Sequence, residues 1–171
     1  EKQFNKLGAF LDFGHASTNF CIFNSDGLVL SRSIFVGGKD LTALISQEFK
    51  VGFEEAQELK HKSSSLVGPG GDEIQNKVQA LCQKHFSSIL EKFHRTCITL
   101  KTNGIGEITT ISLLGGSSNL KGLPEFIVDS LKPLHASISP LSPMIDQKVG
   151  RPSNSIACSL GLSALQPHVK E

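Results

Sequence analysis

Apolar residues in the first part of the chain follow a pattern that predicts β-strands. They form a nearly continuous run over 7–13, alternate with polar residues over 18–23 and return over 28–36. Many of them are β-branched or aromatic, as is common in strands. The letters NSDG at 24–27 lie between the second and third runs, and Asp-Gly is typical of hairpin turns because glycine accepts a positive φ angle. The chain is therefore expected to open as an antiparallel meander of three strands.

After two glycines at 37–38, apolar residues recur every three or four positions, which is the spacing of helices. Asp72, with Gln75 three residues later, is typical of the residue that caps a helix. The Ser-, Gly- and Pro-rich stretch 63–71 is expected to be a mobile loop. The predicted helices cover about 41–49, 53–59, 72–100, 123–131 and 156–164, and two further strands cover 107–114 and 136–139. This order predicts a mixed α/β structure in which helices, the long one above all, pack their apolar stripes on a sheet.

Composition narrows the classes of function. The 171 residues suit one domain, or two small lobes that share a core. Lys and Arg number 17 against 16 Asp and Glu, and no basic stripe indicates a nucleic-acid partner. The apolar runs are too short for a direct membrane span. The chain begins with Glu rather than Met and shows no signal peptide, so we expect a fragment of a longer protein.

The cysteines and histidines give no sign of a disulfide framework or a metal centre. Cys82 and Cys97 fall on one predicted helix, where roughly 20 Å would separate them and exclude a disulfide. Neither they nor Cys21 and Cys158 form a C-x-x-C pair, so we interpret them as reduced, mostly buried thiols of a cytosolic protein. The six histidines are scattered without metal-ligand spacing.

The turn after the first predicted strand combines a carboxylate with small and hydroxyl-bearing residues. Asp12 ends the strand, and Gly14, Ser17 and Thr18 follow. Asp12 could hold the water shell of a Mg²⁺ ion, while the amides of 14–17 and the two hydroxyls could bind phosphate oxygens. Alternatively, Asp12 only accepts hydrogen bonds from its own turn.

A second glycine turn follows the strand at 107–114. Gly115 and Gly116 lack side chains, so an adenine or ribose could rest on the main chain there, next to Ser117. The helix that begins near Gly122 would add free N–H groups. Taken alone, this turn could be just a tight connection. If the two turns face each other, they form one nucleotide cleft.

These motifs resemble those of a known superfamily. The stretch 12–18, DFGHAST, resembles the second phosphate motif of the actin, Hsp70 and sugar-kinase superfamily. The stretch 113–123, LLGGSSNLKGL, resembles its adenosine motif, and 157–162, ACSLGL, resembles its closing helix. Within the superfamily, the stretches GGKDLT at 37–42 and EEAQELK at 54–60 are similar to the PilM branch, which is related to FtsA.

The resemblance implies an α/β, actin-like (ribonuclease H-like) fold: a mixed sheet with covering helices and a smaller inserted α/β subdomain. The chain would correspond to the second, C-terminal half of that fold. The core subdomain would comprise 1–36 and 104–171, and the inserted subdomain would comprise 37–103. The first phosphate motif of the superfamily is absent, and His15 is bulkier than the residue usual in the phosphate turn. The isolated half should therefore bind nucleotide poorly.

The resemblance also implies a function. It predicts a cytoplasmic nucleotide-binding scaffold, peripheral to the inner membrane, in the platform of a type IV pilus or of a type II secretion system. Its partners would be PilN- and GspL-type inner-membrane platform proteins. It would bind ATP and Mg²⁺ without a catalytic residue of its own. The implied contacts are Asp12 (to Mg²⁺ through water), Gly14, Ser17, Thr18, Gly115, Gly116 and Ser117, with Glu55 and Lys60 near the ribose and adenine.

Alternatives remain open from the residues alone. Glu55, Glu58 and Lys60 are also explained as solvated charges on a helix. The protein as a whole could be an active Mg-ATPase or kinase, although the chain offers no convincing catalytic base beyond Asp12. It could equally be a degenerate module that binds proteins and no nucleotide.

Overall fold

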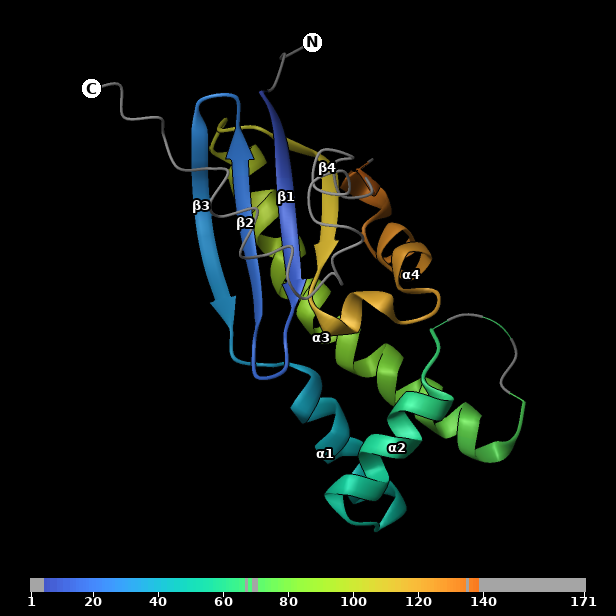
Figure 1. Cartoon of the computed structure of the whole chain (residues 1–171). Coiled ribbons are helices and arrows are strands. Elements are labelled where there is room, and N and C mark those ends of the chain that lie inside the picture. The colour runs from blue at the N-terminus through green and yellow to red at the C-terminus, as the bar shows by residue number, and fades with distance from the viewer. Residues whose placement is uncertain (1–4, 67, 69–70, 135, 139–171) are drawn as a thin grey trace, which may run out of the picture.

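The centre of the structure is a five-stranded sheet, seen in a computed structural model that describes residues 5–66, 68, 71–134 and 136–138 (Figure 1). Its strands are β1 (Lys6–Phe13), β2 (Thr18–Asn24), β3 (Gly27–Ile34), β4 (Glu107–Leu114) and β5 (Ser137–Ile138), in the order β3-β2-β1-β4-β5. The first three strands form the predicted antiparallel meander. β4 pairs parallel to β1, and β5 parallel to β4, so the predicted mixed sheet is confirmed.

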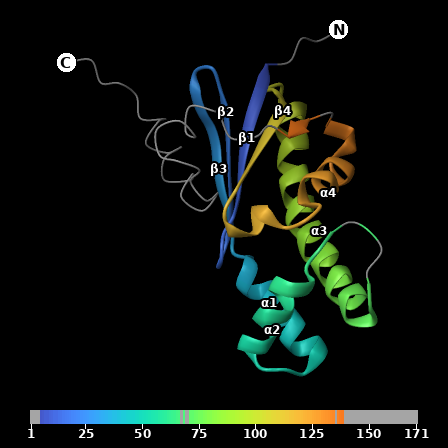
Figure 2. The same ribbon diagram turned by 45° about the vertical axis from the view of Figure 1, so that its right-hand side comes forward.

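One face of the sheet is buried by the long helix α3 (Glu73–Thr102). Figure 2 shows this helix running along the sheet and continuing past its lower end. Phe86 and Phe93 of α3 pack edge-on against Phe13 and Phe20, with ring centroids 5.4 and 5.3 Å apart. As predicted, Asp72 caps the helix, because its side chain accepts a 2.7 Å hydrogen bond from the Gln75 amide.

Two shorter helices form a lobe beyond the lower end of the sheet (Figure 1). They are α1 (Gly38–Phe49) and α2 (Phe53–Ser63), which pack against each other and against the first half of α3. A fourth helix, α4 (Leu123–Ser130), follows β4 and lies beside it. Short 3-10 turns cover Gly116–Asn119 and Lys132–Leu134. The division into a core and an insert at 37–103 remains a prediction.

Several boundaries differ from the sequence prediction, and α2 continues to Ser63, four residues past its predicted end. The third strand ends at Ile34 rather than at residue 36, because the chain turns sharply there and the Val36 amide donates to the Ile34 carbonyl at 2.8 Å. Within the predicted loop at 63–71, Leu66 is buried, and its amide donates to the carbonyl of Lys121 at 2.9 Å. This part of the loop is therefore fixed to the segment before α4.

The remaining predictions concern cysteines and membrane contact. Cys82 and Cys97 are buried, free thiols on α3, and Cys21 is partly exposed. Among the described residues, no helix is long and apolar enough to span a bilayer. The helix expected at 156–164, the motif at 157–162 and Cys158 lie outside the described residues.

Candidate functional site

The two predicted turns lie side by side because the strands that precede them are parallel neighbours. Asp12 of β1 is in register with Leu114 of β4, so both strands end at the same edge of the sheet. A side-chain carbon built on Gly115 would lie 2.5 Å from Oδ1 of Asp12. The spatial relation on which the nucleotide hypothesis depends is thus present in the structure.

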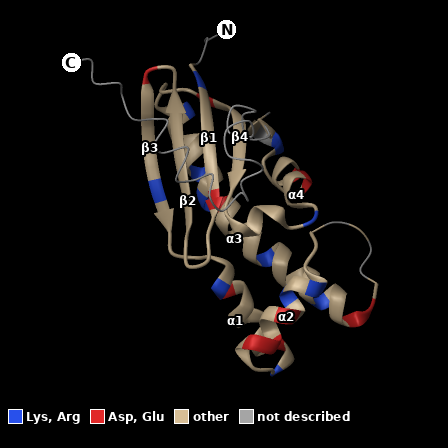
Figure 3. Ribbon diagram, viewed as in Figure 1, with Lys and Arg blue, Asp and Glu red and all other residues tan. Residues whose placement is uncertain are grey.

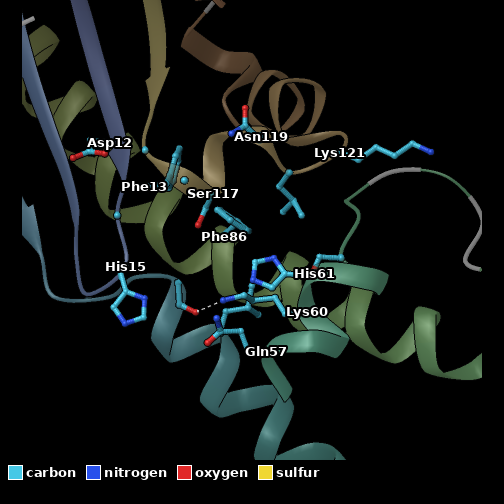
Figure 4. Close-up of a pocket in the computed structure, with 17 residues that line it drawn as sticks. Asp12, Phe13, His15, Gln57, Lys60, His61, Phe86, Ser117, Asn119 and Lys121 are labelled. Atoms are coloured by element: carbon cyan, nitrogen blue, oxygen red, sulfur yellow. Dashed lines mark hydrogen bonds between the residues drawn. The ribbon is translucent and has the colours of Figure 1, made fainter. Parts of the chain in front are cut away.

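A cavity of about 820 Å³ opens at this edge of the sheet (Figure 4). It lies between the strand ends, the lobe of α1 and α2, and the segment that leads into α4. Its lining residues are Asp12, Phe13, Gly14, His15, Gly38, Leu41, Gln57, Lys60, His61, Ser64, Phe86, Gly115, Gly116, Ser117, Asn119, Leu120 and Lys121. Six of the nine residues predicted to bind the cofactor are among them: Asp12, Gly14, Lys60, Gly115, Gly116 and Ser117.

The glycine turn after β4 presents bare backbone to the cavity. Gly115 has a φ of 86°, in the left-handed region that favours glycine. The Ser118 hydroxyl closes the turn by donating to the Gly115 carbonyl at 2.7 Å. A side-chain carbon built on Gly116 would meet no atom within 4 Å. The space over Gly116 is therefore open to a flat group.

The turn after β1 is built differently from the expected nest of free amides. The Gly14 amide donates to the Ser17 carbonyl at 3.0 Å, so it is used within the turn. The carbonyls of Gly14 and His15 accept from the Gly38 and Lys39 amides at 3.0 and 2.8 Å, and thereby cap the first turn of α1. The turn thus binds the N-terminus of a helix through its carbonyl oxygens.

Ser17 and Thr18 do not line the cavity. Thr18 is buried, and its hydroxyl donates to the Val36 carbonyl at 2.9 Å. This bond fixes the chain between β3 and α1. The two hydroxyls, which sequence reasoning assigned to phosphate, are therefore placed beside the site and not in it.

Helix α2 brings Lys60 into the cavity and leaves Glu55 outside. Glu55 belongs to the acidic first turn of α2 and Lys60 to its basic last turn, as the red and blue segments of Figure 3 show. Glu55 is exposed and does not line the cavity. Lys60 is half-buried, and its Nζ donates to the Thr42 hydroxyl at 2.7 Å and to the Gly38 carbonyl at 3.2 Å. Burial lowers the pKa of Lys60, and the nearby Cys82 thiol opposes this shift.

Sequence reasoning missed several lining residues. Gln57 and His61 share the cavity-facing side of α2 with Lys60. Gln57 lies three residues before Lys60, so helical spacing would have found it once Lys60 was assigned, whereas His61 is adjacent to Lys60 and has no such signal. Lys121 and Ser64 reach the site because Ser65 pairs with Lys121. That contact joins distant parts of the chain and has no local signal in the sequence.

The lining suits an anion that carries a flat group. Lys60 and Lys121 contribute positive charge, and Asp12 is the carboxylate among the lining residues. The described residues include no group of three His, Cys, Asp or Glu side chains placed to hold a metal ion. A single carboxylate fits Mg²⁺ held through its water shell, with the remaining ligands supplied by phosphate. The residues present therefore fit a nucleotide with Mg²⁺.

Solved structures with a similar fold include several actin-like proteins. A PilM–PilN type IV pilus biogenesis complex matches with a TM-score of 0.69 and 19% identity, over 95% of this chain and 47% of that chain. MreB 5 of Spiroplasma citri bound to AMPPNP matches with 0.62 and 17%, over 94% and 56%. Ta0583, an archaeal actin homolog, matches with 0.61 and 22%, over 94% and 47%. The chain thus spans about half the length of these structures.

No curated protein matches the sequence. The family described as cell division protein FtsA matches residues 9–161, which is most of the chain. The fold, the sheet topology and this family match all indicate the same group of proteins. The chain belongs to the FtsA family and has the actin-like fold.

Proposed function

We propose that this chain is the nucleotide-binding part of an actin-like scaffold protein, and that it binds an adenine nucleotide with Mg²⁺ in the cavity. The observation that carries the proposal is the meeting of Asp12, the open Gly116 backbone and the ammonium of Lys60 around one cavity. A volume of about 820 Å³ is within the range of small-molecule sites.

Each element of the lining has a role in this proposal. The bare backbone at Gly116 accepts the flat face of the base or ribose. Lys60 supplies positive charge and N–H donors for ligand oxygens, while Lys121 lies at the rim with its side chain directed away from the cavity (Figure 4). Asp12 orders the water shell of Mg²⁺, whose charge offsets that of the phosphates. The turn at 14–17 orients α1 against the site through its carbonyls and contributes less to phosphate binding than its sequence suggested.

The proposed scaffold role extends to partners. The similarity to a PilM–PilN type IV pilus biogenesis complex supports a PilN-type partner. A place in the cytoplasm beside the inner membrane, within a type IV pilus platform, is the further part of this proposal. A GspL-type partner in a type II secretion platform is the second form of this proposal. Co-elution with a PilN-type or a GspL-type protein in size-exclusion chromatography distinguishes the two.

A second candidate function is a module that binds proteins without nucleotide. The observation that favours it is the Gly14 amide, which donates within its own turn and so is unavailable to a phosphate. Under this alternative, the cavity no longer binds nucleotide, and the protein acts only as a scaffold.

A titration of the ¹⁵N-labelled full chain with Mg-ATP, followed by NMR, tests the nucleotide site. We expect the amide signals of Gly115 and Gly116 to shift in a saturable way, because their backbone borders the ligand. Gly116→Val should abolish these shifts without unfolding the chain, since the space over Gly116 is open. Gly52→Val is the matched control, because Gly52 also has open space but lies outside the cavity.

Asp12→Ala in the same titration should weaken the affinity for Mg-ATP more than the affinity for ATP without Mg²⁺, because Asp12 acts through the ion. Absence of saturable shifts at Gly115 and Gly116 with millimolar Mg-ATP would contradict the proposal and favour the nucleotide-free module.

A further inference from the structure

A buried hydroxyl lies beneath the cavity and contacts its lysine. Thr42, in the second turn of α1, is fully buried. Its Oγ1 donates to the Gly38 carbonyl one turn earlier at 3.1 Å and accepts from Nζ of Lys60 at 2.7 Å. A threonine that bonds back to the preceding turn is common in helices. The hydrogen bond that the same hydroxyl accepts from the Lys60 ammonium of α2 is a separate contact, which the formation of α1 does not require.

The ammonium of Lys60 is held by two oxygens that both belong to the start of α1. Besides the Thr42 hydroxyl, the Gly38 carbonyl accepts from Nζ at 3.2 Å, as the dashed line in Figure 4 shows. Gly38 is itself fixed, because its amide donates to the Gly14 carbonyl at 3.0 Å. The hydrogen bonds therefore connect the turn after β1, the start of α1 and the end of α2 along one wall of the cavity.

These two bonds limit where the ammonium can lie. A lysine side chain is flexible, and ordering it costs conformational entropy. An ammonium carries three N–H donors, and the contacts of Lys60 within the described part of the chain use two of them. Because Lys60 lines the cavity, the third donor is available to a ligand there.

We propose that Thr42 is a positioning residue, which fixes the Lys60 ammonium at the cavity wall so that its third N–H meets an oxygen of the bound nucleotide. The proposal rests on the proposed function for the identity of the ligand. The two hydrogen bonds that fix the ammonium are present whatever the ligand is. Thr42 does not touch the ligand, since it is buried and lies outside the cavity lining.

The test compares Thr42→Val, which removes the hydroxyl at nearly constant shape, with Thr42→Ser, which keeps it. Thr99→Val is the matched control, because the Thr99 hydroxyl makes the same bond to the preceding turn, to the Arg95 carbonyl at 2.9 Å, on the exposed side of α3. In the full chain with labelled lysines, NMR measures the pKa and the side-chain mobility of Lys60. The Mg-ATP titration gives the affinity.

We expect Thr42→Val to lower the pKa of Lys60 further, because the charged form loses an acceptor, and to increase the mobility of its side chain. The affinity for Mg-ATP should fall about tenfold. Thr42→Ser and Thr99→Val should leave all three quantities near those of the unmodified chain. In a Lys60→Met background, Thr42→Val should no longer change the affinity.

An unchanged pKa and mobility of Lys60 in Thr42→Val would overturn the proposal. Equal losses of affinity with and without Lys60 would also overturn it, since Thr42 would then act through another contact. If Thr42→Val does not fold, the mobility of Lys60 in the unmodified chain still tests the proposal. Lys60 should be rigid where the exposed Lys50 is mobile, and equal mobility of the two would refute the fixed ammonium. A chain that binds no Mg-ATP but shows the expected change in Lys60 overturns the proposed function and supports the role of Thr42 in holding the ammonium.

Discussion

At the scale of single residues, the two adjacent glycines after β4, Gly115 and Gly116, have different structural roles. Gly115 combines a positive φ of 86° with close packing, since a side-chain carbon there would lie 2.5 Å from both Asp12 Oδ1 and the Phe13 carbonyl. Gly116 has open space. The first glycine thus permits the strand ends to meet, and the second leaves room above the turn.

This difference predicts the effect of adding one methyl group at each position. Gly115→Ala should lower the free energy of unfolding by about 2–4 kcal/mol, through backbone strain and steric overlap. Gly116→Ala should change it by less than about 1 kcal/mol. Urea denaturation of the two variants measures both values. Similar values for the two would show that the Gly115 turn can rearrange without cost.

Single residues were predicted from sequence where the signal is local. Asp12 and Gly115 each end an apolar strand, and a strand end followed by glycine can be recognised without knowing the fold. Glu55 and Lys60 share one helix, and only the packing of α2 decides which of them faces the cavity. The contact of Thr42 with Lys60 depends on the approach of two helices, so it could not be predicted from either segment alone.

At the scale of elements, helix α3 holds the sheet through one row of side chains. Phe93 is completely buried and packs edge-on against Phe20 of β2. On the same helix, Ile98 is 48% exposed. Burial of a large aromatic side chain contributes substantially to the stability that a helix gains from packing on a sheet.

Phe93→Ala should therefore lower the free energy of unfolding by about 3–5 kcal/mol, because it leaves a cavity between helix and sheet. Ile98→Ala, the control on the exposed side, should cost less than about 1 kcal/mol. Thermal or urea unfolding followed by circular dichroism gives both values. A small effect at Phe93 would mean that α3 contributes little to the stability of the sheet.

Element boundaries followed from periodicity where an element spans several turns or a full strand. The start of α3 was predicted correctly because its cap is local, with Asp72 accepting from Gln75. The end of β3 was predicted two residues too late, because Phe35 and Val36 favour strands, whereas the chain turns at Ile34 and the Val36 amide donates to the Ile34 carbonyl. The fixing of Leu66 to Lys121 has no periodic signal.

At the scale of the whole molecule, the buried thiols connect stability to alkaline pH. Burial raises the pKa of Cys97 to about 12, and burial also raises the pKa of Cys82. The folded chain therefore keeps these protons at a pH where the unfolded chain releases them. Stability must then fall as pH rises from about 9. The lowered pKa of Lys60 acts in the opposite direction, because neutral lysine is easier to bury.

We expect the free energy of unfolding to fall by up to about 1.4 kcal/mol per pH unit for each buried thiol above pH 9. Urea denaturation between pH 8 and about 11 measures this slope. Cys97→Ala should make the slope shallower, whatever its effect on stability at neutral pH. An identical slope in this variant would show that Cys97 is deprotonated as easily in the folded chain as in the unfolded one.

The parallel pairing of β1 with β4 also has a consequence for the order in which the molecule is made. Asp12 and Gly115 are separated by about a hundred residues, and a ribosome adds about 5–20 residues per second. The hairpins of the first three strands can form early during translation, whereas Gly115 is synthesised about 5–20 s after Asp12. The ligand cavity can therefore form only after β4 has been synthesised, well after the first three strands.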